Sequence, residues 1–353
     1  ETFADLVGAT QLIPGPNSSE LAMHLGSQRA GWPGFWVAGI CFILPAVALV
    51  WGIAWGYGAV GARLEVQAAL TGMQPVILAV IVQALWRLHR SLVRTWWAGL
   101  LGALAIVGQL IGVSEMLLVG IAVAVGFGVG LVRTSRMSRS ASDELVPSDP
   151  EEKPRGVLVP IASAPLLPVL AVGTVAATAA VTPWMILVAF LRIGSVLFGS
   201  GYVLLSFLRA EFGTRLGALT DAQLLDAIAI GQVTPGPVFS AATFVGYLLA
   251  GHAGALAATV GIFAPAFVAA AATAPYVVRL RQHTVWSAAL DAVNGVSFAL
   301  MAGVVAVMVH GIRAAPVSVA IFGGASAVLI LTRIGTGWVL LTGAAIGMWP
   351  LLR

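Results

Sequence analysis

The chain has 353 residues, of which 59% are hydrophobic and 9% charged, and its mean hydropathy is +0.98. No class of soluble globular protein has this composition, so we predict a membrane protein that crosses the bilayer many times. The formal charge is +4, and most arginines fall in short segments between apolar runs, which indicates membrane orientation and argues against nucleic-acid binding. The single cysteine, Cys41, excludes disulfides and thiolate metal sites within the chain, and the five histidines show no ligand spacing, so neither metal nor cofactor is predicted.

The apolar runs and the residues between them divide the chain into two halves. Roughly a dozen runs are long enough for a helix to cross a hydrocarbon core of about 30 Å. In the first half the expected spans are residues 3–26, 33–58, 67–88, 96–113 and 116–132. In the second half they are residues 158–181, 184–208, 222–251, 254–278, 285–311, 314–332 and 335–351. The predicted fold is thus an all-α polytopic membrane protein, with a first transmembrane repeat at 1–132, a polar linker at 133–157 and a second repeat at 158–353.

Two similar segments interrupt an apolar run, one in each half. They are Gln11-Leu-Ile-Pro-Gly-Pro-Asn17 and Gln232-Val-Thr-Pro-Gly-Pro-Val238. Proline removes an amide donor and clashes with the preceding turn, so a helix is expected to stop and restart at Pro14-Gly15-Pro16 and at Pro235-Gly236-Pro237. Lipid cannot satisfy the backbone groups that such a break frees, and the N-terminus of a restarted helix attracts anions. Each break is therefore a candidate anion site.

The same spacings recur in both halves. Asp5, Gln11 and the first break match Asp226, Gln232 and the second break at an offset of 221 residues. The pairing continues with Ala30-Gly31 and Ala250-Gly251 at an offset of 220. A duplicated unit is the simplest account of this register.

The arginines indicate how the two units are oriented. With the linker 133–157 assigned to the cytoplasm and each broken run counted as one crossing, the basic segments fall inside and the two units are upside down relative to each other. If the broken runs were re-entrant loops instead, Arg279 and Arg281 would lie outside. Inverted repeats with broken helices are typical of secondary transporters.

The broken segments, together with Phe190-Leu-Arg-Ile-Gly-Ser-Val-Leu-Phe-Gly-Ser-Gly-Tyr-Val203 and Phe244-Val-Gly-Tyr247, resemble the chromate ion transporter family over most of the chain. The resemblance implies a carrier of the bacterial inner membrane that exports chromate, an oxyanion close to sulfate in shape and charge. The chain begins at Glu1, and the first-half counterpart of Phe198–Tyr202 would precede it, so we expect the first repeat to have a further N-terminal helix.

Polar residues near the breaks are the candidates for binding the anion. They are Gln11, Asn17, Ser18, Ser19, Arg192, Ser195, Ser200, Tyr202, Gln232, Thr234 and Ser240. The Arg192 guanidinium can form two parallel hydrogen bonds to an oxyanion, or it can reach the lipid headgroups from a helix end. The serines and Asn17 can donate to the anion or cap the restarted helix. The glutamines can line the site or satisfy carbonyls freed by the prolines.

Three acidic residues lie in apolar surroundings near the breaks. Glu20, about 6 Å past Pro16 along the helix, is a candidate for proton coupling, with a pairing to Arg192 or His24 as the alternative. Asp5 and Asp226 lie nine residues before their breaks, about 13 Å by helical rise, so we expect them near the membrane surface.

We interpret the chain as a secondary transporter that exports chromate, and possible alternatives are an anion channel or a sulfate uptake carrier on the same architecture. Its partners are the oxyanion and the lipid bilayer, and it is expected to be a monomer or a homodimer. A membrane enzyme is disfavoured because the sequence has one cysteine and no nucleotide or haem motif.

Overall fold

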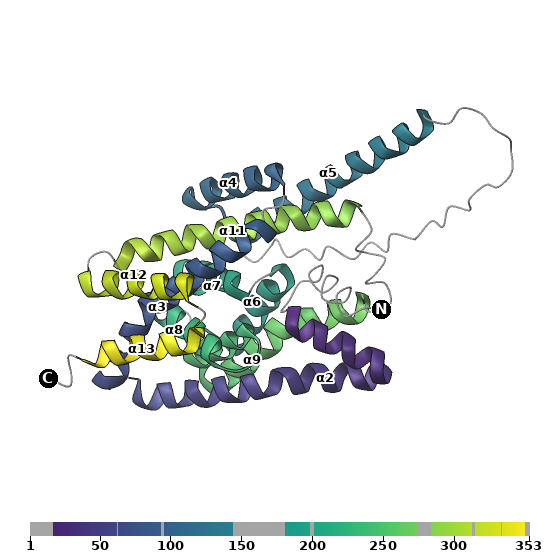
Figure 1. Ribbon diagram of the computed structural model, residues 1–353. Coiled ribbons are helices and arrows are strands. Elements are labelled where there is room, and N and C mark those ends of the chain that lie inside the picture. The colour runs from purple at the N-terminus through teal and green to yellow at the C-terminus, as the bar shows by residue number, and fades with distance from the viewer. Residues whose placement is uncertain are drawn as a thin grey trace.

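A computed structural model describes residues 17–61, 63–92, 95–143, 181–197, 201–273, 284–312, 315–332 and 334–349, and every regular element in them is a helix (Figure 1). Five helical ranges are long and apolar enough to cross a membrane: Ser18–Val60, Leu64–His89, Glu115–Ser135, Val238–Ala272 and Val285–Gly311. The predicted class, an all-α polytopic membrane protein, is confirmed.

In the first half the described helices are α2 (Asn17–Val60), α3 (Leu64–Leu92), α4 (Trp96–Leu110) and α5 (Glu115–Asp143). The second half begins with α6 (Pro183–Val196), the 3-10 turn η1 (Gly201–Val203), α7 (Leu204–Leu208) and the π-helical η2 (Arg209–Arg215). It continues with α8 (Asp221–Val233), η3 (Val238–Ser240), α9 (Ala241–Thr273), α11 (Thr284–Gly311), α12 (Pro316–Leu331) and α13 (Thr336–Met348). Helix α5 runs eleven residues into the predicted linker, and residues 144–157 lie outside the described part of the chain.

Local sequence accounts for the starts of two helices that matter for the site. Thr182 precedes α6, its hydroxyl accepts a hydrogen bond from the Met185 amide, and Pro183 occupies the first helical position. Thr220 and Gln223 form a reciprocal capping box at the start of α8. Arg209 then anchors this start from η2 through two hydrogen bonds to the Asp221 carboxylate, at 2.9 and 3.2 Å.

Helices α2 and α9 each fold back on themselves as a helical hairpin. In α2 the reversal is at Ala30 (φ −142°, ψ 21°) and Gly31 (φ 61°, ψ −145°). In α9 it is at Ala250 (φ −150°, ψ 33°) and Gly251 (φ 59°, ψ −145°). Glycine adopts this positive φ without the penalty that a Cβ atom brings. The same local conformation thus recurs 220 residues apart (250 − 30).

Small residues allow the arms of each hairpin to touch. A Cβ atom on Gly26 would lie 2.2 Å from the Gly34 carbonyl oxygen, and one on Gly246 would lie 2.2 Å from the Gly254 carbonyl oxygen. Close backbone approach through glycines is common between membrane helices. The two hairpins also pack against each other, with Trp36 of α2 stacked on Phe267 of α9 at 5.4 Å between ring centroids.

The helices that follow the hairpins exchange partners between the halves. Helix α3 of the first half packs against α12 and α13 of the second, and α11 of the second half packs against α4 and α5 of the first. Figure 1 shows α4, α5 and α11 along one side of the molecule and the two hairpins along the other. Glycines again permit the contacts, since a Cβ on Gly72 of α3 would lie 2.2 Å from the Gly343 oxygen of α13, and one on Gly102 of α4 would lie 2.8 Å from the Gly295 oxygen of α11.

Most tryptophans are exposed and lie toward helix ends, as expected for the aromatic belts at membrane interfaces. These are Trp32, Trp36, Trp55, Trp86, Trp96, Trp184, Trp286, Trp338 and Trp349. The interior is instead built from large apolar side chains around α7, α8 and the first arm of α9, including Phe207, Phe212, Phe239 and Phe244. In the segment between α8 and η3, Thr234 and Pro237 are buried, whereas Pro235 and Gly236 are exposed.

Candidate functional site

The site forms where helical structure is interrupted between α8 and η3. Helix α8 ends at Val233, and the Thr234 hydroxyl donates to the Ile230 carbonyl at 2.6 Å, which also accepts the Thr234 backbone N–H at 3.1 Å. Helical structure resumes at Val238. Between them Gly236 has φ 138° and touches α2 so closely that a Cβ atom on it would lie 2.5 Å from Ala46 Cβ. Only glycine fits this position.

Two further elements meet at the interruption. A Cβ atom on Gly201 of η1 would lie 3.1 Å from Val238 Cβ, so the glycine-rich segment lies directly against the restart of the helix. From the same turn the Tyr202 hydroxyl lies 3.5 Å from Gln232 Oε1 at the end of α8. Residues 201–202 and 232–238, distant in sequence, therefore come together, with α2 on a further side.

Two buried donors at this place have no partner in the described part of the chain. They are Gln232 Nε2 and the Ser240 hydroxyl, and Ser240 is fully buried. Buried polar groups are nearly always hydrogen-bonded, because leaving one unpaired costs about 1–3 kcal/mol. The first N–H groups of a restarted helix also lack acceptors in their own helix and carry its positive dipole end. This arrangement offers several hydrogen-bond donors to an acceptor-rich anion.

The first arm of the α2 hairpin holds a buried carboxylate. Glu20 is fully buried, and neither of its oxygens has a hydrogen-bond partner among the described residues. Ser19 and His24 are buried beside it in the same helix, at 0% and 4% exposure. The alternative weighed from sequence pairs Glu20 with Arg192 or His24, and among the described residues the Glu20 carboxylate makes a hydrogen bond to neither.

The other residues predicted from sequence are distributed unevenly. Ser195 is exposed and donates to the Leu191 carbonyl at 2.7 Å, as serines within helices commonly do. Arg192 is half-buried on α6 and makes no ion pair with any described residue, and Ser18 is exposed. Outside the described residues or side chains lie Gln11, Pro14, Gly15, Pro16, Asn17 and Ser200.

Asp226 is buried between helices, a contact that its distance to the break along the helix did not predict. It is 3% exposed on α8, where it accepts hydrogen bonds from the Tyr57 hydroxyl of α2 and from Gln74 Nε2 of α3, both at 3.3 Å. Helical rise gives distance along the axis, but α2 and α3 cover this side of α8 laterally. An acidic residue among apolar neighbours is the feature of the sequence that could have indicated a buried, functional carboxylate.

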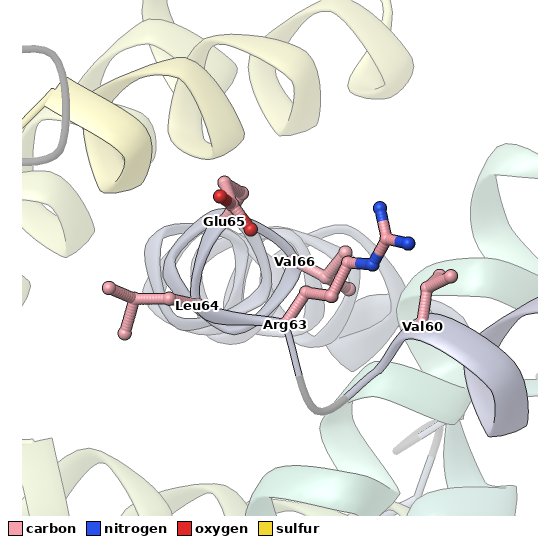
Figure 2. A pocket seen from close by; sticks show the side chains of 5 residues that line it. All are labelled: Val60, Arg63, Leu64, Glu65 and Val66. Carbon is pink, nitrogen blue, oxygen red and sulfur yellow. The ribbon is translucent and has the colours of Figure 1, made fainter.

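A separate hollow of about 590 Å³ lies at the turn from α2 to α3 (Figure 2). It is lined by Val60, Arg63, Leu64, Glu65 and Val66. Arg63, Leu64 and Glu65 are exposed, and the one guanidinium and one carboxylate among the lining residues give the hollow no net charge to attract an anion. We therefore place the functional site at the α8–η3 interruption.

No group of three or more potential metal ligands occurs among the described residues.

Comparisons with known proteins give a consistent assignment. The family model described as "Chromate transporter" matches residues 1–127 and 184–348. The chain is 32% identical over 273 residues to the "Chromate transport protein" of Pseudomonas aeruginosa, which covers 75% of this chain and 61% of that protein. It is 25% identical over 313 residues to the "Chromate transport protein" of Cupriavidus metallidurans, covering 87% of this chain and 72% of that protein. The chain thus spans less than two thirds of the length of the Pseudomonas relative. No solved structure matches it.

Proposed function

Because the chain belongs to the chromate transporter family, we propose that it is a secondary transporter that carries chromate, or the similar oxyanion sulfate, outward across the plasma membrane. The relatives' names supply the substrate class. The observation that carries the proposal is the pair of buried, unpartnered donors beside the α8–η3 interruption, Gln232 Nε2 and Ser240 Oγ.

The anion is held by these donors and by the amides of the restarted helix. A tetrahedral oxyanion has several acceptor oxygens, so it can receive the Gln232, Ser240 and backbone N–H groups together. Tyr202, at 3.5 Å from Gln232, orients the glutamine so that its Nε2 faces the site. Arg192 of α6 lies earlier in the same glycine-rich segment and contributes a positive charge. In the first half the corresponding donors are Gln11, Asn17, Ser18 and Ser19.

Glu20 is the proposed site of proton coupling beside the anion. Its buried carboxylate has no hydrogen-bond partner among the described residues, and a second negative charge nearby favours its protonated form. Binding of a dianion would therefore be accompanied by proton uptake, and release of the anion by proton release. A proton that leaves with the dianion lowers the net charge moved from two to one, so the electrical driving force of the coupled step is about 2.3 kcal/mol per 100 mV.

The two halves are proposed to be inverted repeats, each with an interrupted membrane helix, and to alternate access by moving against each other. The recurrence of the hairpin conformation at an offset of 220 residues supports a duplicated unit. The exchange of helix partners between halves makes their interface the surface on which such a motion would occur. The linker 133–157 is placed in the cytoplasm by its basic residues.

The membrane potential alone is sufficient to drive export. Moving a dianion out of a cell that is negative inside releases about 4.6 kcal/mol per 100 mV, twice the value for one charge. An anion channel on the same architecture is the second candidate, because the same donors would attract an anion in either case.

Flux through proteoliposomes tests the proposal. The full chain is reconstituted, and labelled chromate and sulfate are followed under an imposed voltage. Saturable chromate flux toward the positive side, with competition by sulfate, is expected. Flux that does not saturate would favour the channel, and absence of chromate flux would contradict the proposed function.

Pro235→Ala gives the same assay a structural control. Alanine restores an amide donor and helix propensity between α8 and η3, so the interruption should become helical and the flux should be lost. The matched control is Pro316→Ala at the first position of α12, where proline occupies a helix start away from the site. Normal flux with Pro235→Ala in a folded protein would contradict the assigned site.

A further inference from the structure

A buried acid connects the two halves of the molecule at a distance from the anion site. Asp226, on α8 of the second half, is 3% exposed. Its Oδ2 accepts a hydrogen bond from the Tyr57 hydroxyl of α2, and its Oδ1 accepts one from Gln74 Nε2 of α3, each at 3.3 Å. Both donors therefore belong to the first half, and the acceptor belongs to the second.

The partners of Asp226 suit a group that gains and loses a proton. Hydrogen bonds to a charged carboxylate are usually 2.5–2.9 Å long, whereas both contacts here are 3.3 Å. A tyrosine hydroxyl and a glutamine amide can each donate or accept, so they can bond to either the charged or the neutral carboxyl group. An arginine in their place would hold the carboxylate charged. An isolated charge inside a membrane is costly, which favours the neutral form while the site is closed.

The elements packed against α8 bring no charged group into contact with Asp226 within the described residues. Helix α2 contributes Tyr57, and α7, η3 and α13 carry no titratable side chain. In η2, Arg209 pairs with Asp221 and Arg215 pairs with Glu211. The titratable side chains of α3 and α9 whose surroundings are described are Glu65, Arg87, His89, Tyr247 and His252, and none of them hydrogen-bonds or forms an ion pair with Asp226.

The Asp226 cluster and the anion site are both built on α8 and α2, so a movement of these helices affects both. Gln232 follows six residues later on α8, about 9 Å along the axis. The interruption after it rests on α2 through Gly236 and Ala46, and Tyr57 lies further along the same α2, with its ring 5.1 Å from that of Phe244. Any separation of α8 from α2 and α3 would therefore open the Asp226 cluster and disturb the anion site together.

We infer that Asp226, Tyr57 and Gln74 form a proton-binding site at the interface of the two halves. One proton binds a carboxylate oxygen of Asp226 and makes a neutral carboxyl group, which stays in the closed interface with Tyr57 and Gln74. When the halves separate, water reaches Asp226, the proton leaves to water, and the carboxylate remains. This inference rests on the proposed transport function, but the site is distinct from Glu20 and from the anion donors.

Asp226→Asn tests the site, because asparagine keeps the shape of the neutral form and cannot exchange the proton. Proteoliposomes containing the full chain and a trapped pH-sensitive dye are given chromate at fixed voltage, with and without a pH gradient. The wild-type chain should move protons with chromate and respond to the gradient. Because Glu20 is a separate proton site, the test is made in a Glu20→Gln background, where Asp226→Asn should keep voltage-driven chromate flux and lose the remaining proton movement and the remaining response to the gradient.

The matched control is Asp221→Asn, an acid on the same helix whose side chain is 47% exposed and paired with Arg209. It should behave like the wild type, whereas Tyr57→Phe, which removes one donor, should reduce the proton movement without abolishing it. A gradient response of Glu20→Gln that persists unchanged when Asp226→Asn is added, or a wild-type response to a sodium gradient in place of a proton gradient, would overturn the inference. So would loss of all flux in folded Asp226→Asn, since that indicates a structural role.

A second measurement is independent of transport. Infrared difference spectra of the purified chain on acidification should contain a band of a buried protonated carboxyl group that is missing in Asp226→Asn. An unchanged band would assign the proton to another acid and overturn the inference. If the wild type carries no chromate, the proposed function fails, and the infrared result still decides whether Asp226 exchanges a proton.

Discussion

The two helical hairpins, α2 and α9, share a backbone conformation but differ in the polar side chains they bury. Their turns have the same dihedral angles, and their arms cross at Gly26 and Gly34 in one and at Gly246 and Gly254 in the other. The first hairpin buries Glu20 and His24. The second has no acidic residue, and it buries Ser240 and Thr243. Backbone shape is thus determined by the glycines, while the chemistry of each copy is free to differ.

If the glycines determine the conformation of the hairpins, equivalent substitutions should destabilise the protein equally in both. Gly26→Ala and Gly246→Ala each place a Cβ atom 2.2 Å from a backbone oxygen, and backbone cannot move aside as a flexible side chain can. We expect each to lower stability by about 3 kcal/mol, the upper end of the usual cost of overpacking. Thermal unfolding in detergent measures this.

Gly52→Ala is the control for these variants, because its Cβ would meet no atom within 4 Å. A large loss of stability from the substitution in only one hairpin would show that different contacts maintain the shared conformation in the two hairpins.

The difference in chemistry should appear when the acid of the first hairpin is removed. Glu20→Gln replaces a buried carboxylate that has no described partner with an uncharged group of the same shape, so folding should be retained. We expect chromate flux to fall about tenfold, equivalent to about 1.4 kcal/mol.

Glu65→Gln provides the comparison for Glu20, since Glu65 is an exposed acid at the start of α3 in the same half. Equal flux in the two variants would remove Glu20 from the mechanism.

The smallest effect is expected when a polar contact of one hairpin is exchanged for the apolar contact of the other. The Thr243 and Thr259 hydroxyls are 2.8 Å apart in α9, and Met23 packs over Gly39 at the corresponding place in α2. The double variant Thr243→Met with Thr259→Gly should lower the free energy of unfolding by at most about 1 kcal/mol, the value of one hydrogen bond.

The single variant Thr243→Met should lower the free energy of unfolding by more, because the methionine lacks the space that glycine leaves at position 259. Thermal unfolding would compare the two variants. A double variant no more stable than the single one would contradict the equivalence of these positions.

The sequence predicted the helical membrane class and the turns of the hairpins well, because both have strong local signals. Long apolar runs predict spans, and the Ala30-Gly31 and Ala250-Gly251 pairs, matched in sequence, adopt matching dihedral angles. The extension of α5 to Asp143 was missed, because a polar stretch with serine and arginine suits both a helix and a linker.

Sequence reasoning reached the site only in part. It named Tyr202, Gln232 and Ser240, which the structure brings to one interruption, but also Ser195, which bonds to its own helix. It did not predict the burial of Asp226, because that burial depends on Tyr57 and Gln74, more than 150 residues away in the chain. Contacts between distant helices leave no periodic signal in a single sequence.

The exchange of helix partners between the halves has a consequence for biosynthesis. As the ribosome makes the first half, α3, α4 and α5 enter the membrane before α11, α12 and α13 exist, so the surfaces they later bury face lipid in the meantime. Neither half can complete its own packing, and a chain truncated in the linker would leave those surfaces open. Assembly is therefore completed only when the last helices arrive, and a fragment made alone is expected to be degraded unless the missing half is supplied as a separate polypeptide.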